Sequence, residues 1–316
     1  MAHTHHHLAF VFPGQGSQSI GMLSELSELH PGIRQTFAEA SDGASVDLWA
    51  LSQGGPDVML NRTEYTQPAL LAAGVAVWRA WLEAGGARPA RLAGHSLGEY
   101  TALVAAGTLS LRDAAHLVRI RGQLMQEAAP EGEGAMAAVL GAEDALVEEV
   151  CGEVSEDRVV VPANYNSPGQ IVIGGHTDAV DRAIAALTAR GVRKVVKLAV
   201  SVPSHTPLMR EAANQLVEAM SAYEWKTPSI PIVQNVDASV HTGTAAIRDA
   251  LARQLYLPVR WSECVDVLTK AGATAIVECG PGKVLAGLVK RIDKAIDARA
   301  LGTPAEFESA LQDLRA

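Results

Sequence analysis

Short apolar runs alternate with stretches of helical periodicity along most of the chain, and this alternation predicts an α/β fold. The first run, residues 8–12, is rich in strand formers and stops at Pro13 and Gly14, so we expect a buried strand that leads into a loop. Another strand should begin at Arg91 and run into an Ala-rich helix that ends at Ala106. The other strands expected in this pattern are 230–235 and 275–279, and the other helices are 33–39, 67–83, 111–128 and 244–254.

The order of elements changes between residues 135 and 199, where the pattern predicts β-α-β-β-α-β. The expected strands are 136–140, 159–162, 170–174 and 194–198, and the expected helices are 142–151 and 177–190. This order is typical of a ferredoxin-like lobe. We therefore expect a small subdomain at 131–199, inserted into a large α/β subdomain made of 8–130 and 200–316. Residues 1–7 contain several histidines, precede the first expected strand and look like the remnant of an expression tag.

The composition is that of a globular protein with a sizeable core. The 316 residues, 48% of them hydrophobic, exceed the usual single-domain length of about 100 to 200 residues. A net charge of −9 argues against nucleic-acid binding, because phosphates are neutralised by clustered Lys and Arg. No apolar run is long enough to cross a membrane, and no signal peptide is evident. The three cysteines form no CxxC pair, which disfavours a disulfide framework or a zinc site and suits the cytoplasm.

The segment Gly94-His95-Ser96-Leu97-Gly98 fits the pattern G-x-S-x-G of a nucleophile elbow. Its glycines permit a tight turn between strand and helix, and the turn leaves the Ser96 hydroxyl exposed at the start of the helix. There the free N–H of Leu97 can stabilise an oxyanion. The alternative is an ordinary strand-to-helix turn without chemistry, because the pattern alone is only moderately specific.

A serine hydroxyl is a weak nucleophile at neutral pH and needs a general base within hydrogen-bond reach. His205 is the best candidate because it lies in a loop after a strand, where catalytic groups are often found. His95 is adjacent to the serine, but neighbouring residues at an elbow point in different directions, so we expect it to give hydrogen-bond support only. The other histidines lie in ordinary helical or loop contexts; they are His30, His116, His176 and His241.

Four motifs together resemble those of the bacterial malonyl-CoA:acyl-carrier-protein transacylases. They are FPGQGSQ at 12–18, GHSLGE at 94–99, SVPSH at 201–205 and ECGPG at 278–282, in the order and spacing of that family. The resemblance covers the chain from Leu8 onward. It implies an α/β-hydrolase-like large subdomain, a ferredoxin-like small subdomain and an active site in the cleft between them. It also implies transfer of a malonyl group from malonyl-CoA to the phosphopantetheine thiol of an acyl carrier protein, for fatty acid biosynthesis.

The resemblance also assigns roles to the residues that match the family's motifs. Ser96 resembles the acylated nucleophile and His205 its base, and the backbone N–H groups of Gln15 and Leu97 resemble the oxyanion hole. Arg121 matches the arginine that binds the free carboxylate of the malonyl group; a guanidinium pairs with a carboxylate in a bidentate manner that lysine cannot reproduce. From the sequence alone a solvated charge on the helix face is the favoured interpretation of Arg121, since Arg119 offers the same chemistry; only the family register separates the two.

Three further positions follow from the resemblance. Gln254 matches the residue whose main-chain carbonyl orients the histidine, which implies a Ser-His dyad in which the nearby aspartates take no part; these are Asp178, Asp181 and Asp237. Asn164 and Asn166 resemble a loop that lines the cleft, although Asn, Pro and Gly before a strand are also ordinary turn residues.

The expected reaction needs neither a metal nor another cofactor, because it exchanges a thioester for an oxyester. Carrier proteins of this pathway are acidic, so docking on this acidic chain requires a local basic surface, for which Arg190, Arg193 and Lys194 are candidates. Their alternative role is that of a solvated helix end. We expect a monomer. The competing functions are a polyketide-synthase acyltransferase that acts in trans, an α/β-hydrolase thioesterase and a catalytically inactive scaffold.

Overall fold

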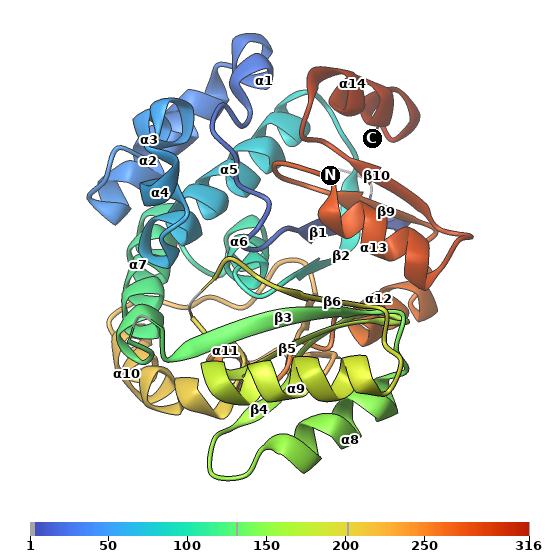
Figure 1. Ribbon diagram of the computed structural model, residues 1–316. Coiled ribbons are helices and arrows are strands. Elements are labelled where there is room, and N and C mark those ends of the chain that lie inside the picture. Colours follow the sequence, from blue (N-terminus) through green and yellow to red (C-terminus); the bar gives the residue numbers. More distant parts are fainter. Residues whose placement is uncertain (1–3, 131, 201, 316) are drawn as a thin grey trace.

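The structure is a computed structural model that describes residues 4–130, 132–200 and 202–315. Residues 1–3, Glu131 at the start of the expected small subdomain, Ser201 in the loop that carries His205, and Ala316 lie outside this description. Two sheets organise the chain, and each has its own helices (Figure 1). No helix of the described ranges is long and apolar enough to span a bilayer.

The larger sheet has six strands in the order β10-β9-β1-β2-β7-β8, and all of its pairs are parallel except that of β7 with β8. Its strands are β1 (Thr4–Phe12), β2 (Arg88–Gly94), β7 (Ile232–Gln234), β8 (Ser239–Val240), β9 (Ala275–Glu278) and β10 (Asp297–Ala300). From Leu8 to Phe12 the central strand β1 is apolar on both faces, as is typical of a parallel strand covered by helices. Phe10 packs edge-on against Trp78 and Trp81 on one face, while Ala9 and Val11 belong to the core on the other.

Most helices belong to the large subdomain. They are α1 (Ser24–Leu29), α2 (Gly32–Ala44), α3 (Leu48–Gly54), α4 (Asp57–Leu60), α5 (Thr63–Glu83), α6 (Gly98–Ala105), α7 (Leu111–Glu127), α10 (Arg210–Met220), α11 (Thr244–Tyr256), α12 (Trp261–Lys270), α13 (Val284–Ile292) and α14 (Pro304–Asp313), with a 3-10 turn η1 (Pro207–Met209) before α10. Helix α5 is buried along almost its whole length, because it lies between the sheet and the outer helices. It thereby brings its polar residue Gln67 into the interior.

The first strand begins earlier than its apolar run suggests. We expected it at Leu8, with residues 1–7 outside the fold, but β1 starts at Thr4 and pairs there with Arg88 and Pro89 of β2. A parallel neighbour offers backbone hydrogen bonds whatever the side chains are, so the strand continues beyond its apolar part. Residues 4–7 are therefore part of the large sheet.

The smaller sheet is antiparallel and has the order β4-β5-β3-β6. Its elements are β3 (Gly134–Leu140), α8 (Asp144–Val154), β4 (Val160–Ser167), β5 (Gln170–His176), α9 (Thr177–Ala189) and β6 (Lys194–Lys197). This is the ferredoxin-like arrangement that the sequence predicts. Helices α8 and α9 cover the outer face of the sheet, around a core that includes Val147 and Ile173 (Figure 1). The other face turns toward the large sheet.

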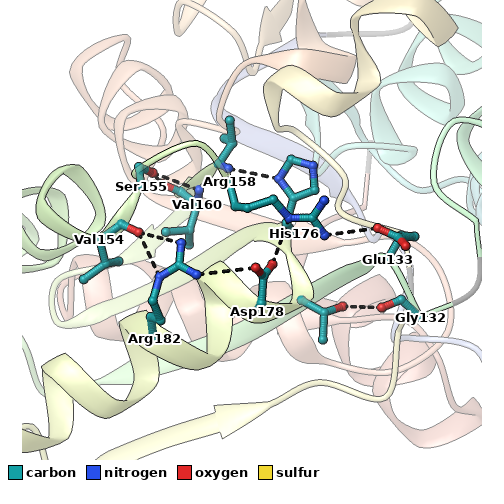
Figure 2. A network of polar contacts seen from close by, with 11 residues as sticks. Gly132, Glu133, Val154, Ser155, Arg158, Val160, His176, Asp178 and Arg182 are labelled. Carbon is teal, nitrogen blue, oxygen red and sulfur yellow. Dashed lines mark hydrogen bonds and ion pairs between the residues drawn. The ribbon is translucent and has the colours of Figure 1, made fainter.

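A surface network holds one end of the small sheet together, as Figure 2 shows. Arg158 donates to Asp178 and to Glu133, each at 3.1 Å, and Arg182 donates to the carbonyl of Val154 and to Asp178. The C-terminal end of α8 and the start of α9 are thereby tied to the segment before β3. Asp178 thus pairs with Arg158 and Arg182 on the surface of the small subdomain.

Strand β4 joins the small sheet to the large subdomain. The N–H of Tyr165 donates to the carbonyl of Val259, and the N–H of Val259 donates to the carbonyl of Ala163, both at 2.9 Å. Asn164 and Asn166 lie within β4 and are buried, so our expectation of a loop at this place is wrong. The turn residues that suggested a loop, Pro168 and Gly169, form the hairpin one step further on.

Candidate active site

The nucleophile elbow forms between the end of β2 and the start of α6. Ser96 has φ of 52°, a left-handed conformation that non-glycine residues seldom adopt and that is common at functional sites. The flanking glycines are required by space: a Cβ on Gly94 would lie 1.9 Å from the carbonyl carbon of Gly98, and one on Gly98 would lie 2.1 Å from the carbonyl oxygen of Phe12. The sequence therefore folds so that the serine side chain stands clear of the turn.

Asn235, at the end of β7, braces this strained turn. Its Oδ1 accepts from the N–H of Ser96 at 2.7 Å, and its Nδ2 donates to the carbonyl of Gly94 at 2.7 Å. Sequence reasoning missed this residue. A polar side chain directly after a buried strand, at the same edge of the sheet as the elbow, was the signal that could have found it.

His205 faces the serine. Its Nε2 lies 2.9 Å from Ser96 Oγ, while its Nδ1 lies 2.6 Å from the main-chain carbonyl of Gln254. Since a carbonyl only accepts, Nδ1 carries the proton and Nε2 is free to accept one from the serine. His205 also has a left-handed φ, of 63°, and its own N–H donates to the carbonyl of Leu255. Burial, together with the nearby charge of Arg121, lowers the pKa of His205 to about 3, so the imidazole is neutral at physiological pH.

Arg121, on α7, reaches the same hydroxyl from the other side. Its Nη2 donates to Ser96 Oγ at 3.2 Å and to Gln254 Oε1 at 2.9 Å, and its Nη1 donates to Gln67 Oε1 at 2.8 Å. The side chain is only 1% exposed, and its Nε has no hydrogen-bond partner among the described residues. Burial lowers the pKa of Arg121. Among the described residues this buried cation has no direct carboxylate partner, and its free donor favours an anionic ligand.

Arg119, the other arginine that the sequence offered for binding a carboxylate, points away from Ser96. Residues two positions apart on a helix face different sides, and the Arg119 guanidinium donates to the carbonyl of Ala44 and lies 5.8 Å from the ring of Tyr65. The structure thus brings Arg121 and not Arg119 to the serine. Gln67, which accepts from Arg121, was missed; the available signal was a lone amide directly before the long apolar run of α5.

These groups open into one cavity between the two subdomains. Its polar lining comes mainly from the large subdomain and includes Ser96, His205, Arg121 and Gln67, with Asn164 and Asn166 of β4 added from the small one. An apolar wall, which we define as Met136, Val172, Leu198 and Val200, comes from the small sheet and the segment after β6.

The two amides expected in an oxyanion hole also line the cavity. Gln15 and Leu97 both contribute to it, and neither N–H has a hydrogen-bond partner among the described residues. Leu97 directly precedes the first residue of α6, where the helix dipole favours negative charge. His95 points away from the serine: its Nε2 lies 2.8 Å from Asn166 Oδ1, and its ring lies 5.5 Å from that of Trp261.

The aspartates named above have other partners. Asp178 binds Arg158 and Arg182, Asp181 binds Lys197, and Asp237 binds His241 and Arg253. The imidazole is therefore oriented by a backbone carbonyl in place of an acid. Within the described residues, no cluster of three or more His, Cys, Asp or Glu side chains could hold a metal ion.

A serine, an imidazole and a buried guanidinium converge in a cleft of an α/β-hydrolase-like core, an arrangement that suits an acyltransferase. The sequence agrees, because the model of the acyl transferase domain family matches residues 9–304. The malonyl CoA-acyl carrier protein transacylase of Salmonella typhimurium is 52% identical over 96% of this chain and 98% of its own. The chain therefore belongs to the family of malonyl CoA-acyl carrier protein transacylases.

Solved structures agree with this placement over the whole fold. A malonyl-CoA:acyl carrier protein transacylase from Xanthomonas oryzae pv. oryzae has a TM-score of 0.99 and 73% identity, and the match covers 99% of this chain and 100% of that one. A malonyl-transacylase solved in complex with its type II polyketide acyl carrier protein has a TM-score of 0.95 and 50% identity, over 97% of this chain and 99% of that one.

Proposed function

We propose that this enzyme transfers a malonyl group from malonyl-CoA to the phosphopantetheine thiol of holo acyl carrier protein through a malonyl ester of Ser96. The observation that carries the proposal is the pair of distances at one hydroxyl: 2.9 Å from Ser96 Oγ to His205 Nε2 and 3.2 Å to Arg121 Nη2. A general base and a group that binds carboxylates thus meet at the nucleophile. The names of the relatives point to the same donor and acceptor.

The first half of the cycle forms the acyl-enzyme. His205 Nε2 takes the proton of Ser96 as Oγ attacks the thioester carbonyl, and the carbonyl oxygen becomes an oxyanion that the amides of Gln15 and Leu97 can bind. The C–S bond then breaks, and His205 returns the proton to the departing CoA sulfur. The carrier thiol repeats these steps in the second half, in a ping-pong cycle. The exchange of one ester for another needs no metal and no redox cofactor.

Arg121 provides selectivity for an acyl group that ends in a carboxylate. Its planar guanidinium can donate two parallel hydrogen bonds to that group, and the low-dielectric setting strengthens the pairing. An acetyl group would bury the same cation without an anion. The preference for malonyl over acetyl therefore rests on one side chain.

Mass spectrometry of the intact protein tests the proposal. Brief exposure to malonyl-CoA should add one malonyl group, and holo carrier protein should then remove it and gain the same mass. The Ser96→Ala variant should gain nothing. Acylation of another residue, or no acylation of the unaltered enzyme, would refute the proposed intermediate.

A thioesterase would share the elbow and differ in the acceptor. It would release malonate to water, whereas a transferase keeps the ester until a thiol arrives. Malonate release and malonyl-carrier formation, measured in the same reaction, separate these functions. An excess of malonate in the presence of saturating holo carrier would favour the hydrolase.

For carrier docking we propose Arg193 and Lys194 as the main contacts, with Arg190 beside them. Arg193 and Lys194 are exposed and lie at the start of edge strand β6, whose far end leads directly into Leu198 of the apolar wall. Arg190 is already paired with Glu149 and Glu153 of α8, so it has less charge to offer.

Charge reversal tests this surface. Arg193→Glu with Lys194→Glu should raise the KM for carrier about tenfold and leave that for malonyl-CoA unchanged, because two attractive contacts become repulsive. Arg88→Glu is the matched control, since Arg88 is exposed at the opposite end of β2 from the nucleophile. Equal changes in both KM values, or an equal effect of the control, would reject the surface.

The cellular setting is part of the same proposal. We propose fatty acid biosynthesis in the cytoplasm, by a monomeric enzyme. The likeness to a polyketide malonyl-transacylase makes the carrier of that pathway the relevant competitor. Parallel assays with a fatty-acid carrier and a type II polyketide carrier decide between them by the ratio of kcat/KM.

A further inference from the structure

One residue, Gln254, touches both functional side chains of the site. Its main-chain carbonyl accepts from His205 Nδ1, and its side-chain Oε1 accepts from Arg121 Nη2. The carbonyl is fixed by the backbone of α11. The amide can in principle rotate by a half turn, which would place its NH₂ group against the guanidinium.

Oxygen atoms on the other side of this amide set its orientation. Gln254 Nε2 donates to the carbonyl of Ser96 at 3.0 Å, lies 3.3 Å from Asn235 Oδ1 and makes a close hydrogen bond to Glu99 Oε2. An NH₂ group suits this environment, and an oxygen would be repelled by it. Glu99 is the strongest acceptor of the three when it is ionised.

Glu99 is a buried acid that the cycle described above does not use. It lies in the first turn of α6 with 1% of its surface exposed, does not line the cavity and accepts from the N–H of Asn235 through Oε1 at 3.0 Å. Burial raises the pKa of Glu99 to about 8, while its two hydrogen bonds and the Arg121 charge oppose that rise. The fold thus keeps an acid behind Gln254 despite the cost of burying it.

We infer that Glu99 is a positioning residue for the recognition of the acyl carboxylate. It holds the amide of Gln254 so that Oε1 faces Arg121, and Oε1 in turn keeps the guanidinium at Ser96 Oγ. The inference rests on the proposed function. It adds that selectivity for a charged acyl group depends on a chain of contacts from Glu99 to Gln254 to Arg121, whereas the orientation of His205 depends on the backbone alone.

Replacing Glu99 by glutamine keeps the size of the side chain and turns one of its two acceptor atoms into a donor. The N–H of Asn235, fixed at the end of β7, still needs an acceptor, so the oxygen of the new amide stays there. The new NH₂ group then faces Gln254 Nε2. Two donors then oppose each other, and the amide of Gln254 must turn or withdraw. Arg121 loses its acceptor in either case. The carbonyl of Gln254 still holds His205.

The experiment compares a charged with an uncharged acyl donor. Rates of Ser96 acylation by malonyl-CoA and by acetyl-CoA are measured for the unaltered enzyme and Glu99→Gln above pH 8, where Glu99 is mainly ionised. We expect kcat/KM for malonyl-CoA to fall about 10- to 100-fold, as for a lost hydrogen bond to a charged group, and that for acetyl-CoA to change less than about threefold. Equal losses with both donors, or an unchanged ratio, would overturn the inference.

Two further variants make the result decisive. Glu278→Gln is the matched control, because Glu278 is also fully buried, accepts a backbone N–H, that of Ala286, and does not line the cavity. It should leave the malonyl-to-acetyl ratio unchanged. Gln254→Met keeps the main-chain carbonyl and removes the amide, so it should reproduce the selective loss even if Glu99→Gln does not fold. Failure of the proposed function would look different: the unaltered enzyme would not form a malonyl ester.

Discussion

The two walls of the cavity are built on opposite principles. On the large subdomain, Ser96, His205 and Arg121 are each fixed by several hydrogen bonds that lead back to the sheet and its helices. On the small subdomain, the apolar wall presents side chains without directional contacts. We call the wall of the large subdomain the networked wall. It carries the groups that must be placed accurately next to a reacting atom, whereas the apolar wall supplies shape and excludes water.

The seam between the walls combines both principles. Backbone hydrogen bonds between β4 and Val259 join the two subdomains, and the His95 to Asn166 contact adds one side-chain bond directly beside Ser96. The small sheet is thus attached at the level of the cavity. Changes on the networked wall should alter the chemistry, and changes on the apolar wall should alter mainly the binding of the thioester.

We expect the largest effect from removing Arg121, the cation of the networked wall. Arg121→Ala should lower kcat/KM for malonyl-CoA about 100- to 1000-fold, because the malonyl carboxylate would be buried without a partner, and should change that for acetyl-CoA far less. Arg121→Lys should recover only part of the loss, since an ammonium cannot bind the carboxylate in the bidentate manner. Initial rates of acylation with both donors provide the measurement.

Arg119→Ala serves as the control for that prediction. It removes the same charge two residues away, from a side chain that contacts the carbonyl of Ala44. Its malonyl-to-acetyl ratio should match that of the unaltered enzyme. A similar loss in both variants would mean that net charge, and not the position of Arg121, determines selectivity.

The second expected effect concerns the pH range of the base. Burial and the Arg121 charge lower the pKa of His205 to about 3, so its imidazole stays able to accept a proton far below the ordinary histidine value of 6.5. Acylation by acetyl-pantetheine, which has no phosphate to titrate, should therefore show no break near pH 6.5. In Arg121→Ala the acidic limb should move upward, because the repelling cation is gone. A break near pH 6.5 in the unaltered enzyme would contradict the burial argument.

The lowered pKa of His205 also makes the free energy of unfolding depend on pH. The unfolded chain takes up a proton at His205 near pH 6.5, whereas the folded chain does so only near pH 3. The unfolded state therefore binds more protons between these values, and the contribution of His205 to the free energy of unfolding decreases as the pH falls from 6.5. Keeping this imidazole neutral thus makes the contribution of His205 smaller in acid, whereas the raised pKa of the buried Glu99 acts in the opposite direction.

Sequence reasoning succeeded where a signal is local. The elbow around Ser96, the β-α-β-β-α-β order of the small subdomain and most helices of the first half follow from spacing within one segment. The helical spacing of apolar residues that predicts α7 is also present in α12, at Trp261, Cys264, Val265 and Leu268. Helix α12 could therefore have been predicted as well. The early start of β1 could not, because it depends on a neighbouring strand.

The rest of the site depends on contacts between distant segments. Asn235 reaches Ser96 across 139 positions, and Gln254 reaches Glu99 across 155, and neither separation leaves a pattern in the sequence. The choice of Arg121 over Arg119 came from the family register and not from the chemistry, which is the same for both. Two local clues point to such a network: a lone amide beside a long apolar run, as at Gln67, and a polar residue directly after a buried strand, as at Asn235.

We expect the smallest effect from a change in the apolar wall, which tests whether this wall contributes to binding alone. Leu198→Ala removes a side chain that lines the cavity and is only partly buried, so the fold loses little. The KM for malonyl-CoA and for acetyl-CoA should rise together, about two- to fivefold, as expected for lost apolar contact of roughly 1 kcal/mol, and kcat should stay near its original value. Leu198→Met, which restores the volume, should restore both KM values. A change in the malonyl-to-acetyl ratio in Leu198→Ala would show that the apolar wall also takes part in recognising the acyl carboxylate, and the division of labour between the two walls would fail.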